Sequence, residues 1–289
     1  MILYNHTLLV DKEKSTKPTN ILLLKENDSL SINSLFILRL HNNQNRQVAI
    51  TSNNSFSNIE KNQQVNFLVE DVVTFSSCTN SSLIEYKLHK YGSDKLMTYW
   101  LYHTFLPILF TIEDKYYFLH AGAVEVDNKP ILFIANSFGG KSTLTNYFVN
   151  KNHIFISDDK VGVYKKDNAI ISVPSYPFHR PYRRMEDLGV KVDNFSKSNK
   201  EIFCIFNLVK SDSKSKINIS KISGIEKFKA LRYATDIDLS VNKESRFSIL
   251  SDIGNKIDIY NISIPWDLDR LDEVYLRICT FVKDLNEFK

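Results

Sequence analysis

The sequence has little cysteine, no long apolar run and little excess charge, and each shortage excludes a class of protein. Its three cysteines, Cys78, Cys204 and Cys279, are far apart and form no C-x-x-C pair, which indicates reduced thiols in a cytosolic protein. The most apolar window, residues 99–112, is too short to span a bilayer. The net charge of +4, from 37 basic and 33 acidic residues, is too small to indicate a nucleic-acid-binding face.

The start of the chain lacks the basic segment followed by an apolar segment that is typical of a signal peptide. We therefore expect a cytoplasmic protein with no membrane partner and no nucleic-acid partner. With 289 residues, of which 24% are charged and 12% are aromatic, the chain can bury a large core in one large domain or two small ones.

One motif carries most of the chemistry. Residues 135–142, A-N-S-F-G-G-K-S, match the phosphate-loop pattern G-x-x-x-x-G-K-[ST], with Ala135 in place of the first glycine. The apolar run 130–135 predicts a buried strand before the loop, and residues 142–149 predict a helix after it. Loop and helix amides bind phosphate groups in this arrangement. A chance strand–turn–helix is disfavoured, because the lysine, the hydroxyl and both flanks fit the pattern.

The pattern predicts a binding site for ATP and Mg²⁺. Lys141 would reach the β- and γ-phosphates, and the Ser142 hydroxyl would hold Mg²⁺. The residues expected to bind the nucleotide are Asn136, Ser137, Phe138, Gly139, Gly140, Lys141, Ser142 and Thr143.

A second apolar run, residues 153–157, ends in Asp158 and Asp159. We expect it to form a parallel β–α–β unit with the strand before the loop, so that both carboxylates lie beside the loop at the carboxyl edge of the sheet. One carboxylate could hold Mg²⁺ while the other accepts a proton from an attacking hydroxyl. Asp158 is the preferred base and Asp159, with Ser142, the preferred metal site, although the two acids could exchange roles. An isolated acid pair would more simply be a solvated turn.

Three segments in this order resemble the HPr kinase/phosphorylase superfamily: residues 120–124 (H-A-G-A-V), the loop, and residues 157–159 (S-D-D). The resemblance is closer to the shorter relatives that are encoded with ribosomally made, modified peptides such as lasso peptides. It covers roughly residues 115–282 and implies an α/β fold, a P-loop kinase core with a mixed sheet and flanking helices. The implied activity is transfer of the γ-phosphoryl group of ATP to a hydroxyl, with serine of a peptide or protein as the expected acceptor and partner. Homo-oligomerisation is left open.

The glycine-rich segment E-[IV]-R-G-x-G of true HPr kinase/phosphorylases is missing, so neither the phosphorylase reaction nor HPr as substrate is expected. The resemblance places His120 on a strand near the γ-phosphate, where it would support the base; a structural histidine is the alternative. Arg180 and Arg183 lie in a basic loop and could stabilise the transferred phosphoryl group, although a solvated loop or a docking patch for an acidic peptide also fits.

Two other functions remain open. A nucleotide-binding regulator or scaffold without transfer is suggested by the unusual Ala135 and Phe138 in the loop, and a small-molecule hydroxyl kinase would use the same site. A GTPase is disfavoured, although residues 255–258 spell N-K-x-D, because we expect a hairpin corner at Gly254 and Asn255.

The pattern of strands and helices divides the chain at residue 92. Residues 1–92 predict a β-rich module, with strands near 21–24, 34–38, 48–50 and 65–69, that could recognise the substrate or only support the core. Residues 93–289 predict the P-loop domain. It would begin with a helix capped by Ser93 and kinked or ended by Pro107, followed by a strand over 116–126 that forms a hairpin with 130–135.

Overall fold

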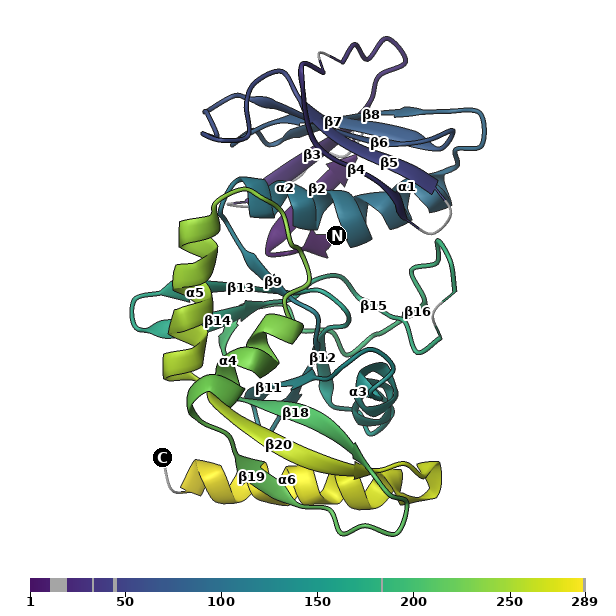
Figure 1. Cartoon of the computed structure of the whole chain (residues 1–289). Coiled ribbons are helices and arrows are strands. Elements are labelled where there is room, and N and C mark those ends of the chain that lie inside the picture. Colours follow the sequence, from purple (N-terminus) through teal and green to yellow (C-terminus); the bar gives the residue numbers. More distant parts are fainter. Residues whose placement is uncertain (11–19, 33, 44–45, 183, 288–289) are drawn as a thin grey trace. The chain divides into compact units, whose positions relative to one another are not determined.

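The computed structural model describes residues 1–10, 20–32, 34–43, 46–182 and 184–287, and its contacts divide the chain into two compact units (Figure 1). The first unit holds residues 1–116, 183–188 and 237–243, and the second holds 117–182, 189–236 and 244–289. The boundary therefore follows residue 116 rather than the expected residue 92, because the helices between 94 and 112 share a core with the N-terminal sheet.

The first unit is built on one eight-stranded sheet in the order β1-β2-β3-β8-β7-β6-β5-β4. Its strands are β1 (Ile2–Leu3), β2 (His6–Val10), β3 (Ile21–Glu26), β4 (Phe36–Asn43), β5 (Arg46–Ser52), β6 (Gln64–Val69), β7 (Val73–Cys78) and β8 (Leu83–Leu88). The four strands expected in this region are present as β3, β4, β5 and β6. Neighbours from β8 to β4 pair antiparallel, whereas β3 is parallel to both β2 and β8.

A helix in three parts follows the sheet: α1 (Asp94–Trp100), the π-helical turn η1 (Leu101–Phe105) and α2 (Leu106–Ile112). Ser93 caps α1 as expected, accepting a hydrogen bond from Leu96 N at 3.4 Å. Pro107 does not end the helix, because it lies at the start of α2 directly after the π turn, where a missing amide donor is tolerated. In the described ranges of the chain, no helix is both long and apolar enough to cross a membrane.

Aromatic rings form the core of the first unit. Phe67 lies 6.1 Å from Trp100 and 5.9 Å from Phe105, measured between ring centroids, and the Phe75 ring stacks on Phe105 at 5.1 Å. The Trp100 indole donates a hydrogen bond of 2.8 Å to Glu186, which joins the segment 184–188 to this core.

The second unit contains a six-stranded mixed sheet in the order β12-β10-β11-β18-β20-β19 and two smaller sheets. The six strands are β10 (Gly122–Val126), β11 (Lys129–Ile134), β12 (Ile154–Ser157), β18 (Cys204–Ser211), β19 (Ile219–Lys221) and β20 (Asp258–Pro265). A four-stranded sheet holds β9 (Tyr117–Leu119), β13 (Val161–Lys166), β14 (Ala169–Val173) and β17 (Lys200–Glu201), and β15 (Phe178–His179) pairs with β16 (Val190–Lys191).

The strand order differs from the expected β–α–β unit in one respect. β11 and β12 both pair antiparallel with β10, so they run in the same direction but have β10 between them. The ends of β11 and β12 and the start of β10 therefore lie at the same edge of the sheet. The residues that follow β11 and β12 and precede β10 are thereby brought to one place.

The prediction of a single strand over residues 116–126 is wrong. Leu119 pairs with Val161 in the four-stranded sheet, whereas Gly122 pairs with Phe133 in the six-stranded sheet. The chain changes sheet between β9 and β10, and His120 lies at this crossing rather than within a strand. Sequence alternation does not reveal the change, because both strands are fully buried.

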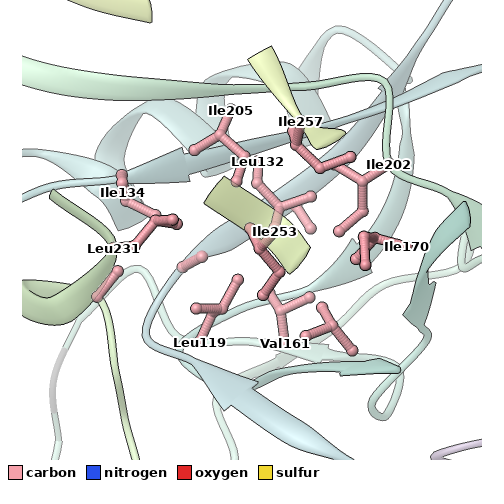
Figure 2. Close-up of a cluster of buried hydrophobic side chains, with 14 of the residues drawn as sticks. Leu119, Leu132, Ile134, Val161, Ile170, Ile202, Ile205, Leu231, Ile253 and Ile257 are labelled. Carbon is pink, nitrogen blue, oxygen red and sulfur yellow. The ribbon is translucent and has the colours of Figure 1, made fainter. Parts of the chain in front are cut away.

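Helices cover both faces of the six-stranded sheet: α3 (Lys141–Asn150) and α6 (Leu271–Glu287) on one, α4 (Gly224–Tyr233) and α5 (Lys243–Lys256) on the other. Side chains of β11 alternate between the two cores, with Phe133 facing α3 and α6, and Leu132 facing Leu231 and Ile253 of α4 and α5 (Figure 2). A sheet buried on both faces explains why its strands are continuous apolar runs.

The prediction of a hairpin corner at Gly254 and Asn255 is also wrong, because both residues lie in α5. A Cβ atom on Gly254 would lie 2.9 Å from the Phe228 ring of α4. This glycine therefore permits close packing of two helices and does not form a turn.

Candidate active site

The predicted phosphate loop connects β11 to α3. Gly140 caps the helix with φ +86°, and Gly139 N donates a hydrogen bond of 2.9 Å to Asn136 O, which closes the loop. The first bond within the helix runs from Leu144 N to Gly140 O, so the amides of the first turn are directed out of the helix N-terminus. The strand, loop and helix expected from the sequence are present here.

Ala135 and Gly139 are sterically matched. A Cβ atom on Gly139 would lie 2.6 Å from Ala135 Cβ and 2.8 Å from Asn136 O, both far inside contact distance. Ala135 itself is buried and has no positive φ, so alanine is tolerated where the phosphate-loop pattern has its first glycine.

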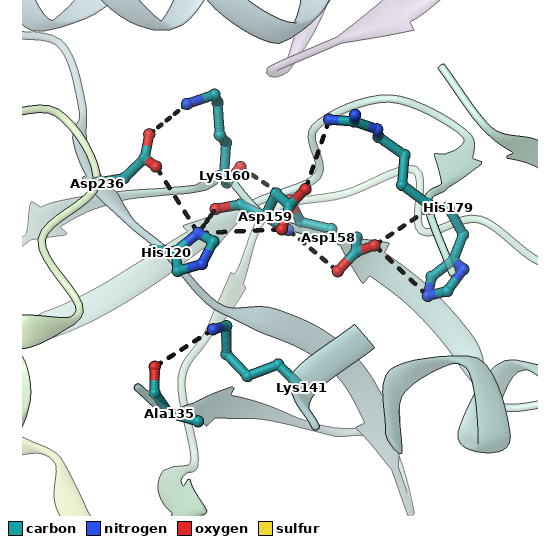
Figure 3. A network of polar contacts seen from close by, with 10 residues as sticks. His120, Ala135, Lys141, Asp158, Asp159, Lys160, His179 and Asp236 are labelled. Atoms are coloured by element: carbon teal, nitrogen blue, oxygen red, sulfur yellow. Dashed lines mark hydrogen bonds and ion pairs between the residues drawn. The ribbon is translucent and has the colours of Figure 1, made fainter. Parts of the chain in front are cut away.

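Lys141 lies across the base of the loop (Figure 3). The residue is 4% exposed, and its Nζ is 3.3 Å from Ala135 O. The ammonium group of Lys141 is therefore a buried positive charge beside the N-terminus of α3.

Asp158 follows β12 and is held by backbone amides. Its Oδ1 accepts a hydrogen bond from Asp159 N and its Oδ2 accepts one from Arg180 N, both at 3.1 Å. The Nε2 atom of His179 lies 3.5 Å from the same Oδ2. Burial, and then the neighbouring charge of Asp159, raise the pKa of the Asp158 carboxyl.

Asp159 has φ +65° and directs its carboxylate to other partners. Its Oδ1 lies 3.9 Å from His120 Nδ1 and its Oδ2 lies 3.7 Å from an Arg180 guanidinium nitrogen. The two acids are therefore adjacent in sequence but face opposite sides of the site: Asp159 faces His120, and Asp158 faces His179. His179 also bonds to the backbone of Ser142, so Ser142 is connected to the acid pair through Asp158.

His120 lies between the acid pair and the lysine. Its backbone N–H donates to Ala234 O at 2.6 Å, and its Nδ1 is 3.2 Å from Asp159 O. Burial, and then the charge of Lys141, lower the pKa of His120, against the opposing effect of Asp159 and Asp236. Burial beside Lys141 thus favours the neutral imidazole. The sequence placed it in support of Asp158, whereas its contacts are with Asp159.

Three residues of this network were not predicted: His179, Lys160 and Asp236. Lys160 Nζ lies 2.5 Å from Asp236, whose other oxygen is 3.8 Å from His120 Nδ1 (Figure 3). Lys160 directly follows the acid pair and His179 directly precedes Arg180, so proximity in sequence could have indicated both. No local pattern marks Asp236, which only the tertiary fold brings here.

Arg180 is 6% exposed, so the expectation of a solvated loop is wrong for this residue. Its backbone and its side chain each contact one acid of the pair. Arg183 lies outside the described residues, and its assignment remains a prediction.

The other predicted nucleotide-binding residues border two cavities beside the loop. Asn136, Ser137, Phe138 and Gly139 line a cavity of about 440 Å³, and Gly140 and Thr143 line a second cavity of about 230 Å³. Phe138 has φ +61° and is 81% exposed.

The described residues include no cluster of three or more His, Cys, Asp or Glu side chains arranged to hold a metal. Mg²⁺ in nucleotide sites is bound by one or two protein oxygens together with phosphates and waters. A serine hydroxyl and a buried carboxylate are ligands of this kind, so Ser142 with one acid of the pair fits Mg²⁺.

No family model matches the sequence, and no curated protein matches it. Among solved structures, the Hpr(Ser) kinase/phosphatase from Coxiella burnetii is similar over 58% of this chain and 95% of that chain, with 14% sequence identity and a TM-score of 0.37. The expected likeness to the shorter peptide-associated relatives remains a prediction. The function is therefore inferred from the geometry of the site.

The contact between Ala135 and Gly139 generates a prediction. Gly139→Ala should displace the loop and weaken binding of Mg·ATP by about tenfold or more, since hydrogen bonds to a charged group are lost. Ser137→Ala changes an exposed side chain but keeps the backbone amide through which this loop residue is expected to bind phosphate, so affinity should stay within about twofold. Calorimetric titration of both variants measures this; equal affinities would show that the close contact does not shape the site.

Proposed function

We propose that the second unit binds ATP with Mg²⁺ and transfers the γ-phosphoryl group to a hydroxyl, with serine of a peptide or protein as acceptor. The observation that carries the proposal is the meeting of a buried lysine, two buried carboxylates and a histidine at one sheet edge. Phosphoryl transfer depends on positioning and charge stabilisation, which a set of this composition supplies.

In this proposal the loop amides and Lys141 bind the phosphates. The ammonium group of Lys141 is already desolvated and held beside the helix N-terminus, so it needs little rearrangement to contact the β- and γ-phosphates. When bound, Mg²⁺ neutralises charge on the phosphate oxygens.

The contacts favour a division of roles between the acids that is the reverse of the sequence preference. Asp159 faces His120, and its side chain is 11% exposed against 3% for Asp158, so an acceptor hydroxyl reaches Asp159 more easily. Asp158 is connected through His179 to Ser142, the predicted metal ligand. We therefore assign proton acceptance to Asp159 and metal binding to Asp158.

In the transfer step, the acceptor oxygen forms a bond to the γ-phosphorus as the bond from that phosphorus to the bridging oxygen breaks, releasing ADP. The hydroxyl proton passes to the Asp159 carboxylate. Neutral His120 donates from Nδ1 to Asp159 O and so orients this residue. The Arg180 guanidinium, near the other side of Asp159, is positioned to stabilise negative charge.

The lysine provides the first test of this proposal. Lys141→Ala should lower Mg·ATP affinity by about tenfold or more, because a charge-assisted contact to phosphate is removed, while the fold is retained. Lys151→Ala, at the exposed end of the same helix, is the matched control and should bind like the wild type. Calorimetry with far-ultraviolet circular dichroism measures both properties; unchanged affinity in Lys141→Ala contradicts the phosphate site.

The acid pair provides a second test. Asp159→Asn should retain Mg·ATP binding but lose transfer by roughly 10²–10⁴-fold, the usual contribution of a general base. Asp158→Asn should instead raise the Mg²⁺ concentration needed for ATP binding. Calorimetry at several Mg²⁺ concentrations measures ATP binding. Mass spectrometry measures transfer to a serine-bearing peptide encoded beside this gene, which should gain one phosphate, and Asp167→Asn in an exposed turn is the control for both.

The outcomes separate the alternatives. Loss of transfer with intact Mg²⁺ dependence in Asp158→Asn would restore the role preferred from the sequence. Tight ATP binding by the wild type without transfer to peptides or to small alcohols would favour a nucleotide-binding regulator. Transfer to small alcohols alone would indicate a small-molecule kinase.

A further inference from the structure

The smaller cavity beside the loop has no role in the chemistry described so far. It measures about 230 Å³ and lies between the start of α3 and the segment that follows β20. We infer, on the basis of the proposed function, that this cavity binds the base of the nucleotide, with Trp266 as its stacking surface.

The order of strands determines the direction of a bound triphosphate. His120 precedes β10 and the acid pair follows β12, both on one side of β11, whereas Trp266 directly follows β20, on the other side of β11 beyond β18. A triphosphate whose γ-phosphate lies at the acid pair therefore crosses the loop and places its nucleoside end toward β18 and β20. The cavity is reached from the loop through Gly140 and Thr143, which line it.

The lining of the cavity suits a flat heteroaromatic ring. Leu144, Leu208, Ile264, Pro265 and Leu271 provide apolar walls. The Trp266 indole is 47% exposed, and its Cζ3 lies 3.8 Å from the position of a Cβ atom on Gly140, so its edge contacts the helix N-terminus. Lys210 Nζ lies 4.2 Å from the indole centroid, a cation–π contact that orients the ring. Ligand cavities usually measure about 300–1,000 Å³, so this smaller one fits a single ring system.

The polar side chains that line the cavity are few. They belong to Thr143 and Asp267, and the Asp267 carboxylate already accepts a hydrogen bond of 3.0 Å from Asp269 N. An apolar pocket discriminates weakly between flat rings that differ only in polar groups. The site should therefore accept both ATP and GTP, with affinities within about tenfold of each other.

The larger cavity is the competing location for the base. Its lining includes the amide pair of Asn207 and Asn261, 2.7 Å apart, together with Lys229 and Glu226. A base in this cavity would be held by hydrogen bonds to these amides and would not stack on Trp266. Tyr233, which is 76% exposed and lines the same cavity, offers a matched aromatic control.

The experiment measures the affinity of the full chain for ATP, GTP and inorganic tripolyphosphate, each with Mg²⁺, by calorimetry. Tripolyphosphate carries the phosphate contacts without a base. Trp266→Ala should lower the affinity for ATP and for GTP by about tenfold or more, because base stacking is lost. The affinity for tripolyphosphate should not change. Trp266→Phe, which keeps an aromatic face, should bind ATP with an affinity within about threefold of the wild type. Tyr233→Ala should change none of the three.

Each other outcome overturns a defined part of the inference. Equal losses for ATP and tripolyphosphate in Trp266→Ala would show that the indole acts on the phosphates or on the fold. A loss of ATP binding in Tyr233→Ala, with Trp266→Ala unchanged, would place the base in the larger cavity. If the wild type binds neither ATP nor tripolyphosphate, the proposed function is overturned, and the inference with it.

Discussion

The antiparallel strand β10 between β11 and β12 determines what meets at the site. It makes β11 and β12 parallel, so that the predicted phosphate loop and the acid pair emerge at the same edge of the sheet. Because β10 runs in the opposite direction, the segment that precedes it brings His120 to that edge as well. Three segments that border consecutive strands thus converge because of the directions in which those strands pair.

This convergence has an electrostatic cost. Two carboxylates, a lysine and an arginine are buried together, and the like charges of Asp158 and Asp159 repel each other. Asp159 has a positive φ, and the two carboxylates face different groups: Asp158 faces His179 and the Arg180 amide, and Asp159 faces His120 and the Arg180 guanidinium. A strained backbone and clustered buried charges of this kind occur mostly at functional sites.

The sequence predicted the parts of the site that depend on local geometry. The loop, its strand and its helix follow from neighbouring residues, since Gly139, Gly140 and Lys141 fulfil steric and charge requirements within a few positions. Asp236 and the contact of His120 with Asp159 could not be predicted, because they depend on a change of sheet between two buried strands that look like one. The hairpin corner predicted at Gly254 was wrong for a related reason. This glycine leaves room for the Phe228 ring of α4, a contact between two helices that no local sequence pattern indicates.

The methyl group of Ala135 has a consequence for the motion of the loop. Alanine restricts the backbone of the unfolded chain more than glycine does, so the end of the loop next to β11 loses less conformational entropy on folding. The remaining freedom is concentrated at the other end, in the consecutive glycines before α3. Of the two glycines, Gly140 lies beside the indole of Trp266, so a change in its backbone angles would be transmitted to that ring.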